Sequence, residues 1–325
     1  MNAQRYNVAG HLLDIRLADA ALVEADILPS FKPFVSEEEG KLLLSLDARL
    51  GPPPDFSEWE EIGQFDCGGA NHGVYRKPTE DTERTEDTER TEDTERTEGS
   101  EGSDRIEGFD YGFRISLPDM QGGELSCCLV ARKQFQECKA VLVAGQHTWQ
   151  FGLNNAIMLA YAFAAADKQT LLVHASVIRN DGWGYLFTAP SGTGKSTHTH
   201  LWYKHIPGSD LMNDDNPVVR IADGQGIVYG SPWSGKTPCY RNIQAPIGGI
   251  ARLEQAPHNK IERMAPVPAF AALLPAVSSM KWDTYIYMSI CKTVGELIQA
   301  VPIYHLDCLP DADAARVSYA KMKGC

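Results

Sequence analysis

The feature that most constrains the fold of this chain is the stretch Ala189-Pro-Ser-Gly-Thr-Gly-Lys-Ser196. It fits the Walker A phosphate-loop pattern, with alanine in place of the usual first glycine. The apolar run Tyr185–Phe187 leads into it, and helix-compatible residues follow it. A sequence of this kind requires a strand, a tight glycine loop and a helix in immediate succession. We therefore expect an α/β (mixed α+β) fold built around this unit.

The same loop has the chemistry of a nucleoside triphosphate site, and a plain glycine-rich turn is the alternative. Its glycines let successive backbone N–H groups converge on phosphate oxygens, and the start of the helix adds partial positive charge. Lys195 can reach the β- and γ-phosphates, and the Ser196 hydroxyl can join a Mg²⁺ shell. The predicted cofactors are ATP and Mg²⁺, and the predicted nucleotide-binding residues are Ser191, Gly192, Thr193, Gly194, Lys195, Ser196 and Thr197.

Two sequence regions with different patterns predict two domains, at residues 1–150 and 151–325. The first reads as short strands separated by turns and is expected to form a smaller, β-rich N-terminal domain. Its predicted strands are Tyr6–Leu17, Leu42–Asp47, Gly73–Arg76, Gly112–Leu117, Leu125–Arg132 and Ala140–Val143.

A low-complexity segment interrupts the first region between residues 77 and 108. The hexamer TEDTER occurs three times from Thr79, and residues 79–107 hold thirteen acids against four arginines. Nine of the chain's thirteen net negative charges therefore come from this segment, and the remainder is only mildly acidic. So polar a segment cannot bury enough apolar surface to offset its ordering entropy, which predicts a disordered acidic insertion. A charged binding arm or a transient helix is the alternative.

The second region alternates strands and helices. Helices are predicted over Gly152–Ala166, Lys195–His205, Pro268–Leu274, Ser279–Gln299 and Ala312–Met322. The dipeptide Asp181-Gly182 predicts a tight turn between the strands LLVHASVI and YLFTA, and Asp223-Gly224 predicts a second hairpin. A short strand over Asp210–Met212 leads into an acidic pair.

That pair, Asp214-Asp215, follows Ser196 by eighteen and nineteen residues. A helix and a second strand fit in this interval, and the right-handed crossover rule brings the end of that strand to the loop's side of the sheet. One carboxylate can then bind Mg²⁺ while the other accepts a proton from an attacking hydroxyl. His174, on the strand before the loop strand, is a third candidate, although an isolated strand histidine is more often structural.

The ordered set His174-Ala-Ser, SGTGKST and Asp214-Asp215 resembles the catalytic domain of the HPr serine kinase/phosphorylase family over about residues 150–325. The resemblance implies a P-loop kinase domain of the phosphoenolpyruvate carboxykinase-like type. It implies that Lys195 contacts phosphate, that Ser196 contacts Mg²⁺, that His174 supports the site and that Asp215 accepts the proton. The other carboxylate of the pair, Asp214, is then the predicted metal ligand. The implied catalytic residues are Asp215, Lys195 and His174.

Three departures from that family pattern bear on the activity. Ala175 follows the histidine where glycine is usual, a further acidic metal ligand is missing from GSPWSGKTPCYR, and NIQAPIGGIARL replaces an arginine-rich signature. These departures argue against phosphorylase activity and against HPr as the acceptor. In SPWSGKT, Lys236 or the following Arg241 are candidate phosphate contacts, with a Trp-anchored surface turn as the alternative. His198, His200 and His205 are expected on the helix surface.

We therefore expect an ATP- and Mg²⁺-dependent kinase that phosphorylates a hydroxyl, most simply a serine of a protein or peptide partner. A small-molecule kinase and a non-catalytic nucleotide-binding regulator are the alternatives. Mild acidity argues against a nucleic-acid partner. The longest apolar run, Ala156–Ala166, is too short to span a bilayer, which predicts a cytoplasmic protein without a membrane partner. A homo-oligomer remains open, and the eight cysteines lack metal-ligand spacing, which favours reduced core thiols.

Overall fold

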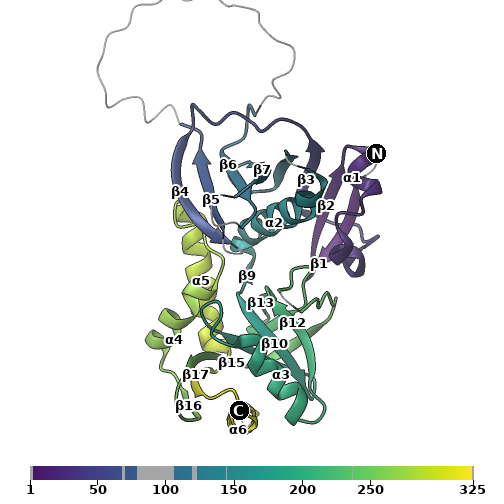
Figure 1. Cartoon of the computed structure of the whole chain (residues 1–325). Helices are drawn as coiled ribbons and strands as arrows, with labels where there is room; N and C mark the ends of the chain where they lie inside the picture. The colour runs from purple at the N-terminus through teal and green to yellow at the C-terminus, as the bar shows by residue number, and fades with distance from the viewer. Residues whose placement is uncertain are drawn as a thin grey trace, which may run out of the picture. The chain divides into compact units, whose positions relative to one another are not determined.

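The computed structural model describes residues 3–67, 70–78, 106–118, 123–143, 145–235 and 237–323. Within these residues the chain is a mixed α/β protein with two sheets and several helices (Figure 1). Most of the acidic repeat segment, residues 79–105, lies outside the described residues. Every helix in the described part of the chain is too short or too polar to cross a lipid bilayer.

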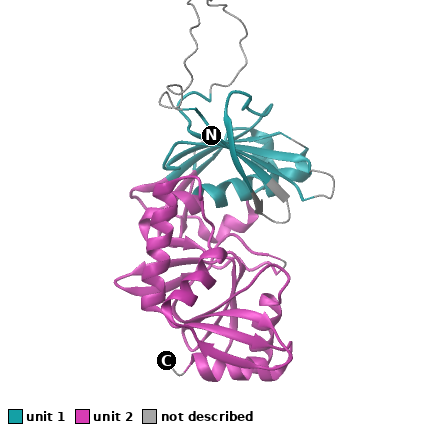
Figure 2. Ribbon diagram, turned by 90° about the vertical axis from the view of Figure 1, so that its left-hand side faces the viewer, with its two compact units in different colours: residues 1–3, 15–27, 44–160 teal, residues 4–14, 28–43, 161–325 magenta. Residues whose placement is uncertain are grey.

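The chain divides into two compact units, shown in different colours in Figure 2. Unit 1 comprises residues 1–3, 15–27 and 44–160, and unit 2 comprises residues 4–14, 28–43 and 161–325. The division differs from a single cut after residue 150, because two N-terminal segments belong to unit 2. Within that unit, the Phe31 ring packs edge-on against Trp233 at 5.9 Å, and the Tyr161 hydroxyl donates to Val8 O at 3.2 Å.

The first sheet has eight strands in the order β1-β2-β3-β8-β7-β6-β5-β4. Its strands are β1 (Gln4–Val8), β2 (His11–Leu17), β3 (Leu42–Leu50), β4 (Glu60–Cys67), β5 (Ala70–Arg76), β6 (Tyr111–Ser116), β7 (Leu125–Ala131) and β8 (Glu137–Leu142). The helical segments of this part are α1 (Ala20–Glu24), η1 (Pro29–Phe34) and α2 (Gln146–Ala164). The predicted strand Tyr6–Leu17 is two strands, because Ala9 and Gly10 both have positive φ and form a tight turn.

The first sheet also contains the vicinal cysteines. Cys127 and Cys128 are both fully buried on β7, and both are free thiols. Burial raises the pKa of the Cys128 thiol to about 11 and raises that of Cys127 as well. Both thiols are therefore protonated near neutral pH, as expected of core residues.

The second sheet has the strand order β12-β10-β11-β15-β14-β13-β9, and β15 also pairs with β17, which pairs with β16. Its strands are β9 (Thr170–Leu172), β10 (Ala175–Asn180), β11 (Trp183–Thr188), β12 (Asp210–Asp215), β13 (Val218–Ala222), β14 (Gln225–Tyr229), β15 (Gln244–Gln255), β16 (Lys260–Arg263) and β17 (Ile303–Cys308). The helical segments are η3 (Ala166–Lys168), α3 (Lys195–His205), α4 (Pro266–Leu273), η4 (Leu274–Ala276), α5 (Thr284–Ala300) and α6 (Ala312–Met322).

Two tight turns lie where they were predicted, although the predicted strand LLVHASVI is divided into β9 and β10, with His174 between them. Asn180 pairs with Trp183 across Asp181-Gly182, and Ala222 pairs with Gln225 across Asp223-Gly224. All four turn residues have positive φ, between 49° and 82°, which is the two-residue type I′ geometry that favours Asp-Gly.

A hydrophobic core lies between the second sheet and two helices, α6 and α3, the helix that follows the glycine-rich stretch. Its buried residues include Phe187, Trp202, Leu253, Tyr304 and Ala315. The Trp202 ring lies 5.0 Å from Tyr185 and 5.4 Å from Tyr319, and its Nε1–H donates to Ser318 Oγ at 2.8 Å. This packing fixes α3 against the strands that carry the loop.

His198 does not lie on the helix surface, so that prediction was wrong for this residue. It is 2% exposed, its Nε2 lies 3.0 Å from Ser318 Oγ, and its ring packs edge-on against Phe187 at 4.5 Å. The reason is its position four residues before Trp202, on the same face of α3. His200 is exposed and His205 is half-buried.

Burial of His198 predicts a pH dependence of stability. Burial lowers the pKa of His198 to about 4, whereas the unfolded side chain titrates near 6.5. Between these values the unfolded chain binds more protons, so stability falls as the pH is lowered from 6.5 towards 4. We expect this residue to contribute about 2 kcal/mol of the loss between pH 7.5 and 5.

Urea unfolding of wild type and His198→Gln across this pH range measures the effect. Because glutamine does not titrate, the mutant is expected to lose that part of the slope. His200→Gln, on the exposed side of the same helix, is the control. Parallel pH profiles for wild type and His198→Gln would contradict the assignment.

Candidate functional site

Three chain segments meet at one edge of the second sheet. β10 runs antiparallel to both of its neighbours, β11 and β12, so its first residue lies beside their last residues. Ala175 is in register with Thr188 on one side and with Asp215 on the other. The sheet therefore brings His174, the loop after β11 and the acidic pair to the same edge. The strand that follows α3 is β12, and it lies one strand away from β11, with β10 between them.

The glycine loop (Ala189–Ser196) has the backbone conformation that its glycines permit. Gly192 and Gly194 have φ values of 79° and 118°, and α3 begins directly at Lys195. A side chain added at either glycine would meet no atom within 4 Å, so the space beside the loop is open. Gln255 Nε2 donates to Thr193 O at 3.0 Å and ties the loop to β15.

Lys195, His174 and Asp215 form a continuous chain of contacts. Lys195 Nζ lies 2.7 Å from His174 Nε2 and donates to Ala189 O at 3.0 Å. His174 Nδ1 lies 3.2 Å from Asp215 Oδ1. A lysine ammonium can only donate, so His174 accepts at Nε2 and carries its proton on Nδ1, facing the carboxylate. Burial lowers the pKa of Lys195, whereas Asp215 and Asp214 act in the opposite direction.

Ser196 and Asp214 form the second half of the site. Ser196 Oγ donates to Asp214 Oδ1 at 2.7 Å, and Asp214 is 3% exposed. Its other oxygen, Oδ2, is buried and has no hydrogen-bond partner among the described residues. A buried carboxylate oxygen without a partner is costly unless a cation or water satisfies it. Asn216 Nδ2 donates to Asp215 Oδ2 at 2.7 Å and orients the neighbouring carboxylate.

The segment after β14 packs directly against the acidic pair. Trp233 is buried, and Asn213 Nδ2 donates to its carbonyl oxygen at 3.0 Å. Gly235 N donates to Asp214 O at 2.5 Å, and a side chain at Gly235 would meet that oxygen at 2.9 Å. A surface turn anchored by tryptophan was one of the two interpretations of this segment, and the buried Trp233 agrees with it.

The sequence also predicted two cationic side chains, Lys236 and Arg241, as candidate phosphate contacts. Lys236 lies outside the described residues. Arg241 Nη1 lies 2.7 Å from Asp210 Oδ2, and Asp210 is the first residue of β12, whereas Asp214 and Asp215 are its last. The structure therefore does not bring Arg241 to the acidic pair.

A cavity of ≈ 510 Å³ adjoins the glycine loop. Gly192, Thr193, Gly194 and Thr197 form one wall. The rest consists mainly of apolar residues from α3, the end of β15 and the segment after β17: Leu201, Leu253, Ala256, Pro257, Leu309 and Pro310. This is a volume typical of small-molecule sites, beside a loop with exposed backbone.

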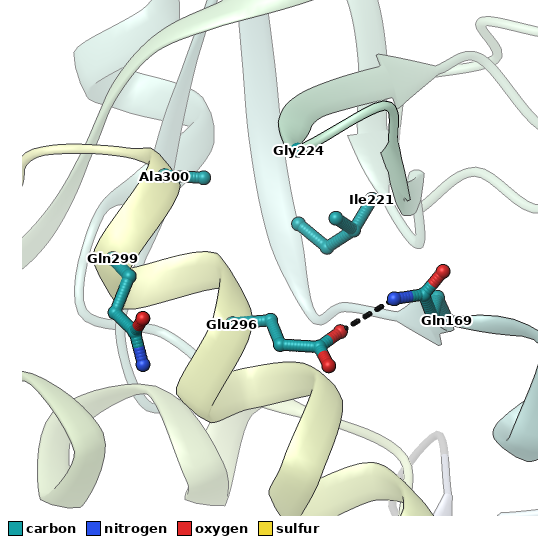
Figure 3. A pocket seen from close by; sticks show the side chains of 6 residues that line it. All are labelled: Gln169, Ile221, Gly224, Glu296, Gln299 and Ala300. Atoms are coloured by element: carbon teal, nitrogen blue, oxygen red, sulfur yellow. Dashed lines mark hydrogen bonds between the residues drawn. The ribbon is translucent and has the colours of Figure 1, made fainter.

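A second cavity, of ≈ 320 Å³, lies near the start of β9 and is shown in Figure 3. Its lining residues are Gln169, Ile221, Gly224, Glu296, Gln299 and Ala300. Gln169 Nε2 donates to Glu296 Oε2 at 2.7 Å, so two of its polar groups already satisfy each other (Figure 3). It contains none of the predicted site residues, which leaves the glycine loop as the candidate site.

Some residues of the site were not predicted from the sequence. Asn216 could have been noticed, because it directly follows the acidic pair in NDDN. Gln255 and the cavity residue Leu309 belong to no local motif, and only the pairing of β15 with β11 and β17 brings them to the loop.

Fold and site together describe a mixed α/β protein in which a glycine loop, an acidic pair and a histidine meet at one sheet edge. No protein-family model and no curated protein matches the chain. Of the solved structures, the Hpr(Ser) kinase/phosphatase from Coxiella burnetii is similar at 12% identity, with a TM-score of 0.27. That match covers 47% of this chain and 94% of the other, and it is a weak structural similarity.

Proposed function

We propose that this protein is an ATP- and Mg²⁺-dependent phosphotransferase whose phosphate loop is the glycine loop. The observation that carries the proposal is the 2.7 Å hydrogen bond from Ser196 Oγ to Asp214 Oδ1, which joins the loop to the acidic pair. A loop of this type needs open space beside its backbone, and Gly192 and Gly194 leave that space free.

The residues present fit a bound Mg²⁺. The hydroxyl of Ser196 and the unpartnered Oδ2 of Asp214 are hard oxygen ligands of the kind that Mg²⁺ prefers. When bound there with ATP, the ion would neutralise charge on the phosphates. The adjoining cavity offers apolar walls and the Gln255 amide to a nucleoside.

Asp215 is the proposed general base. Its carboxylate is held by His174 and Asn216, and its side chain is 32% exposed, so an acceptor hydroxyl can reach it. The acceptor oxygen loses its proton to Asp215 and bonds to the γ-phosphorus as the bond from that phosphorus to ADP breaks. Lys195 supplies positive charge at the transferred group, and His174 positions both Lys195 and Asp215.

The acceptor is proposed to be a serine hydroxyl of a protein or peptide. Support comes from the sequence resemblance to the HPr serine kinase/phosphorylase family, whose order of motifs matches that of His174, the glycine loop and Asp215. A small hydroxyl compound is the alternative substrate. A nucleotide-binding regulator without catalysis is the alternative activity, and it requires no general base.

Loss of the loop lysine tests nucleotide binding directly. Lys195→Ala is expected to weaken Mg·ATP binding by about 10- to 100-fold, because it removes a charge-assisted phosphate contact. Titration with a fluorescent ATP analogue measures the change. Lys204→Ala, exposed on the same helix, is the matched control. Equal affinity for Lys195→Ala and wild type would sink the phosphate-loop assignment.

A further inference from the structure

A cluster of histidine and carboxylate side chains lies on the last strands of the second sheet, outside the site described above. Its members are Glu254 on β15, and His305 and Asp307 on β17. One oxygen or nitrogen atom of each lies within 4.8 Å of those of the other two. Two carboxylates and an imidazole together match the ligands and the charge of a divalent cation.

The strand register explains why these side chains meet. Glu254 lies directly opposite Asp307 in the parallel pair β15–β17. His305 and Asp307 are two residues apart on β17, so both project to the same face, whereas Leu306 between them is fully buried in the core. The three groups therefore project from paired strands and not from a loop.

The separations fit metal coordination. His305 Nε2 lies 3.0 Å from Asp307 Oδ1 and 3.7 Å from Glu254 Oε2. Ligand bonds of 2.0–2.2 Å in tetrahedral geometry place neighbouring ligand atoms about 3.4 Å apart, which lies between these two distances. The ligand atoms of Glu254 and Asp307 lie within 4.8 Å of each other, and a water would take the fourth tetrahedral position.

A second histidine approaches the cluster from the turn between β15 and β16. His258 Nε2 lies 3.6 Å from the other carboxylate oxygen of Asp307, Oδ2. The neighbouring Asn259 fixes this turn, because its side chain accepts from Leu309 N at 2.8 Å and donates to Asp311 Oδ1 at 3.1 Å. A histidine that contacts a ligating carboxylate from outside the set of ligands, as His258 contacts Asp307, orients that carboxylate.

Two cations lie near the cluster, and one of them is neutralised by a carboxylate outside it. The two carboxylates of the cluster therefore keep excess negative charge. Arg252 lies opposite His305 in the strand register, and Lys260 lies opposite Asp307. Lys260 Nζ is paired with Glu262 Oε2 at 2.9 Å, so that lysine is compensated within its own strand.

We propose that Glu254, His305 and Asp307 bind a divalent transition-metal ion of the Zn²⁺ class, with His258 orienting Asp307. The imidazole ligand favours such an ion over Mg²⁺ or Ca²⁺. The ion joins the ends of β15 and β17, next to the residues that line the cavity beside the glycine loop. The proposal does not rest on the proposed phosphotransferase function.

The test is a Zn²⁺ titration of the metal-depleted full chain against a chelating dye, without nucleotide. All titrations and further variants use the Asp214→Asn protein as the parent, because this substitution removes the other carboxylate that is expected to bind metal. One equivalent of tightly bound Zn²⁺ is expected. His258→Gln should weaken it by about 10- to 100-fold, and His305→Gln by more.

His147→Gln is the matched control, because His147 forms a similar contact with Glu124, at 3.1 Å, in the other unit. It should leave Zn²⁺ affinity unchanged. Thermal melts without metal establish that each variant is folded, and Zn²⁺ should raise the melting temperature of the parent but not of His305→Gln. Absence of stoichiometric binding by the parent, or equal affinity in folded His305→Gln, overturns the proposal and leaves only histidine–carboxylate ion pairs.

Discussion

Replacing Asp215 by asparagine is expected to lower phosphoryl transfer by about 10²–10⁴-fold, the usual contribution of a general base, while ATP binding is retained. Asparagine keeps the shape of the side chain, and its carbonyl oxygen can still accept the proton of His174 Nδ1, which lies 3.2 Å from the present carboxylate. It loses the negative charge that accepts a proton from the acceptor hydroxyl, and its NH₂ group replaces Oδ2, so the Asn216 amide must turn its oxygen towards that group. ATP turnover with and without serine-containing peptides and small hydroxyl compounds measures the effect.

Asp223→Asn is the control for this experiment. It makes the same chemical change at an exposed turn residue with positive φ, a conformation that asparagine tolerates. Its turnover should equal that of wild type. If Asp215→Asn turns over as fast as wild type, the assignment of the base is wrong. If wild type binds ATP but no acceptor stimulates turnover, the regulator alternative gains support.

The second large effect concerns folding of unit 2. Trp202→Ala is expected to lower the free energy of unfolding by about 3–5 kcal/mol, the range for removal of a buried tryptophan. The indole is fully buried, packs against Tyr185 and Tyr319, and donates to Ser318 Oγ at 2.8 Å. Urea unfolding followed by circular dichroism measures the loss.

Tyr203→Ala provides the comparison for the tryptophan variant. Tyr203 is the next residue of α3 but is 62% exposed, so its removal should change the unfolding free energy by less than about 0.5 kcal/mol. Similar losses in the two variants would mean that α3 does not pack as described.

Local sequence signals predicted two helices of unit 2 to the residue, whereas the helix predicted over Ser279–Gln299 begins only at Thr284, after its N-cap Asp283. The predicted bounds Lys195–His205 and Ala312–Met322 are confirmed, as are both Asp-Gly turns. Each of these elements has a local cause. Gly194 begins one helix, the side chain of Asp311 caps another by accepting from Ala314 N, and Asp-Gly fits positive φ at two successive residues.

Elements without such local signals were missed. β4 (Glu60–Cys67) begins with acidic residues and shows little apolar alternation, so its pairing with β5 depends on the tertiary fold. The buried face of α3 was also missed, because Lys195, His198 and Thr199 are polar side chains. Their spacing relative to Trp202 follows the helical period and was the available signal.

The candidate site shows the same contrast between features with a local sequence signal and features that depend on the tertiary fold. Sequence spacing placed the acidic pair on the loop's side of the sheet, because a strand that returns after a crossover ends at that edge. It did not reveal that β10 separates β11 from β12, nor that His174 bridges Lys195 and Asp215. Those contacts depend on strand register, which no local motif specifies.

The two-residue turn Asp181-Gly182 has a consequence for where the chain can change length. It is exposed and lies about 20 Å, six residues of strand, from the edge where His174 meets Lys195. An extra residue there is taken up by a longer loop, because β10 is also paired with β12, and a one-residue slip would turn its alternate side chains to the opposite face. An insertion, a tag or new chain ends can therefore be placed at this exposed turn without moving the strand residues that form the site at the other end of β10.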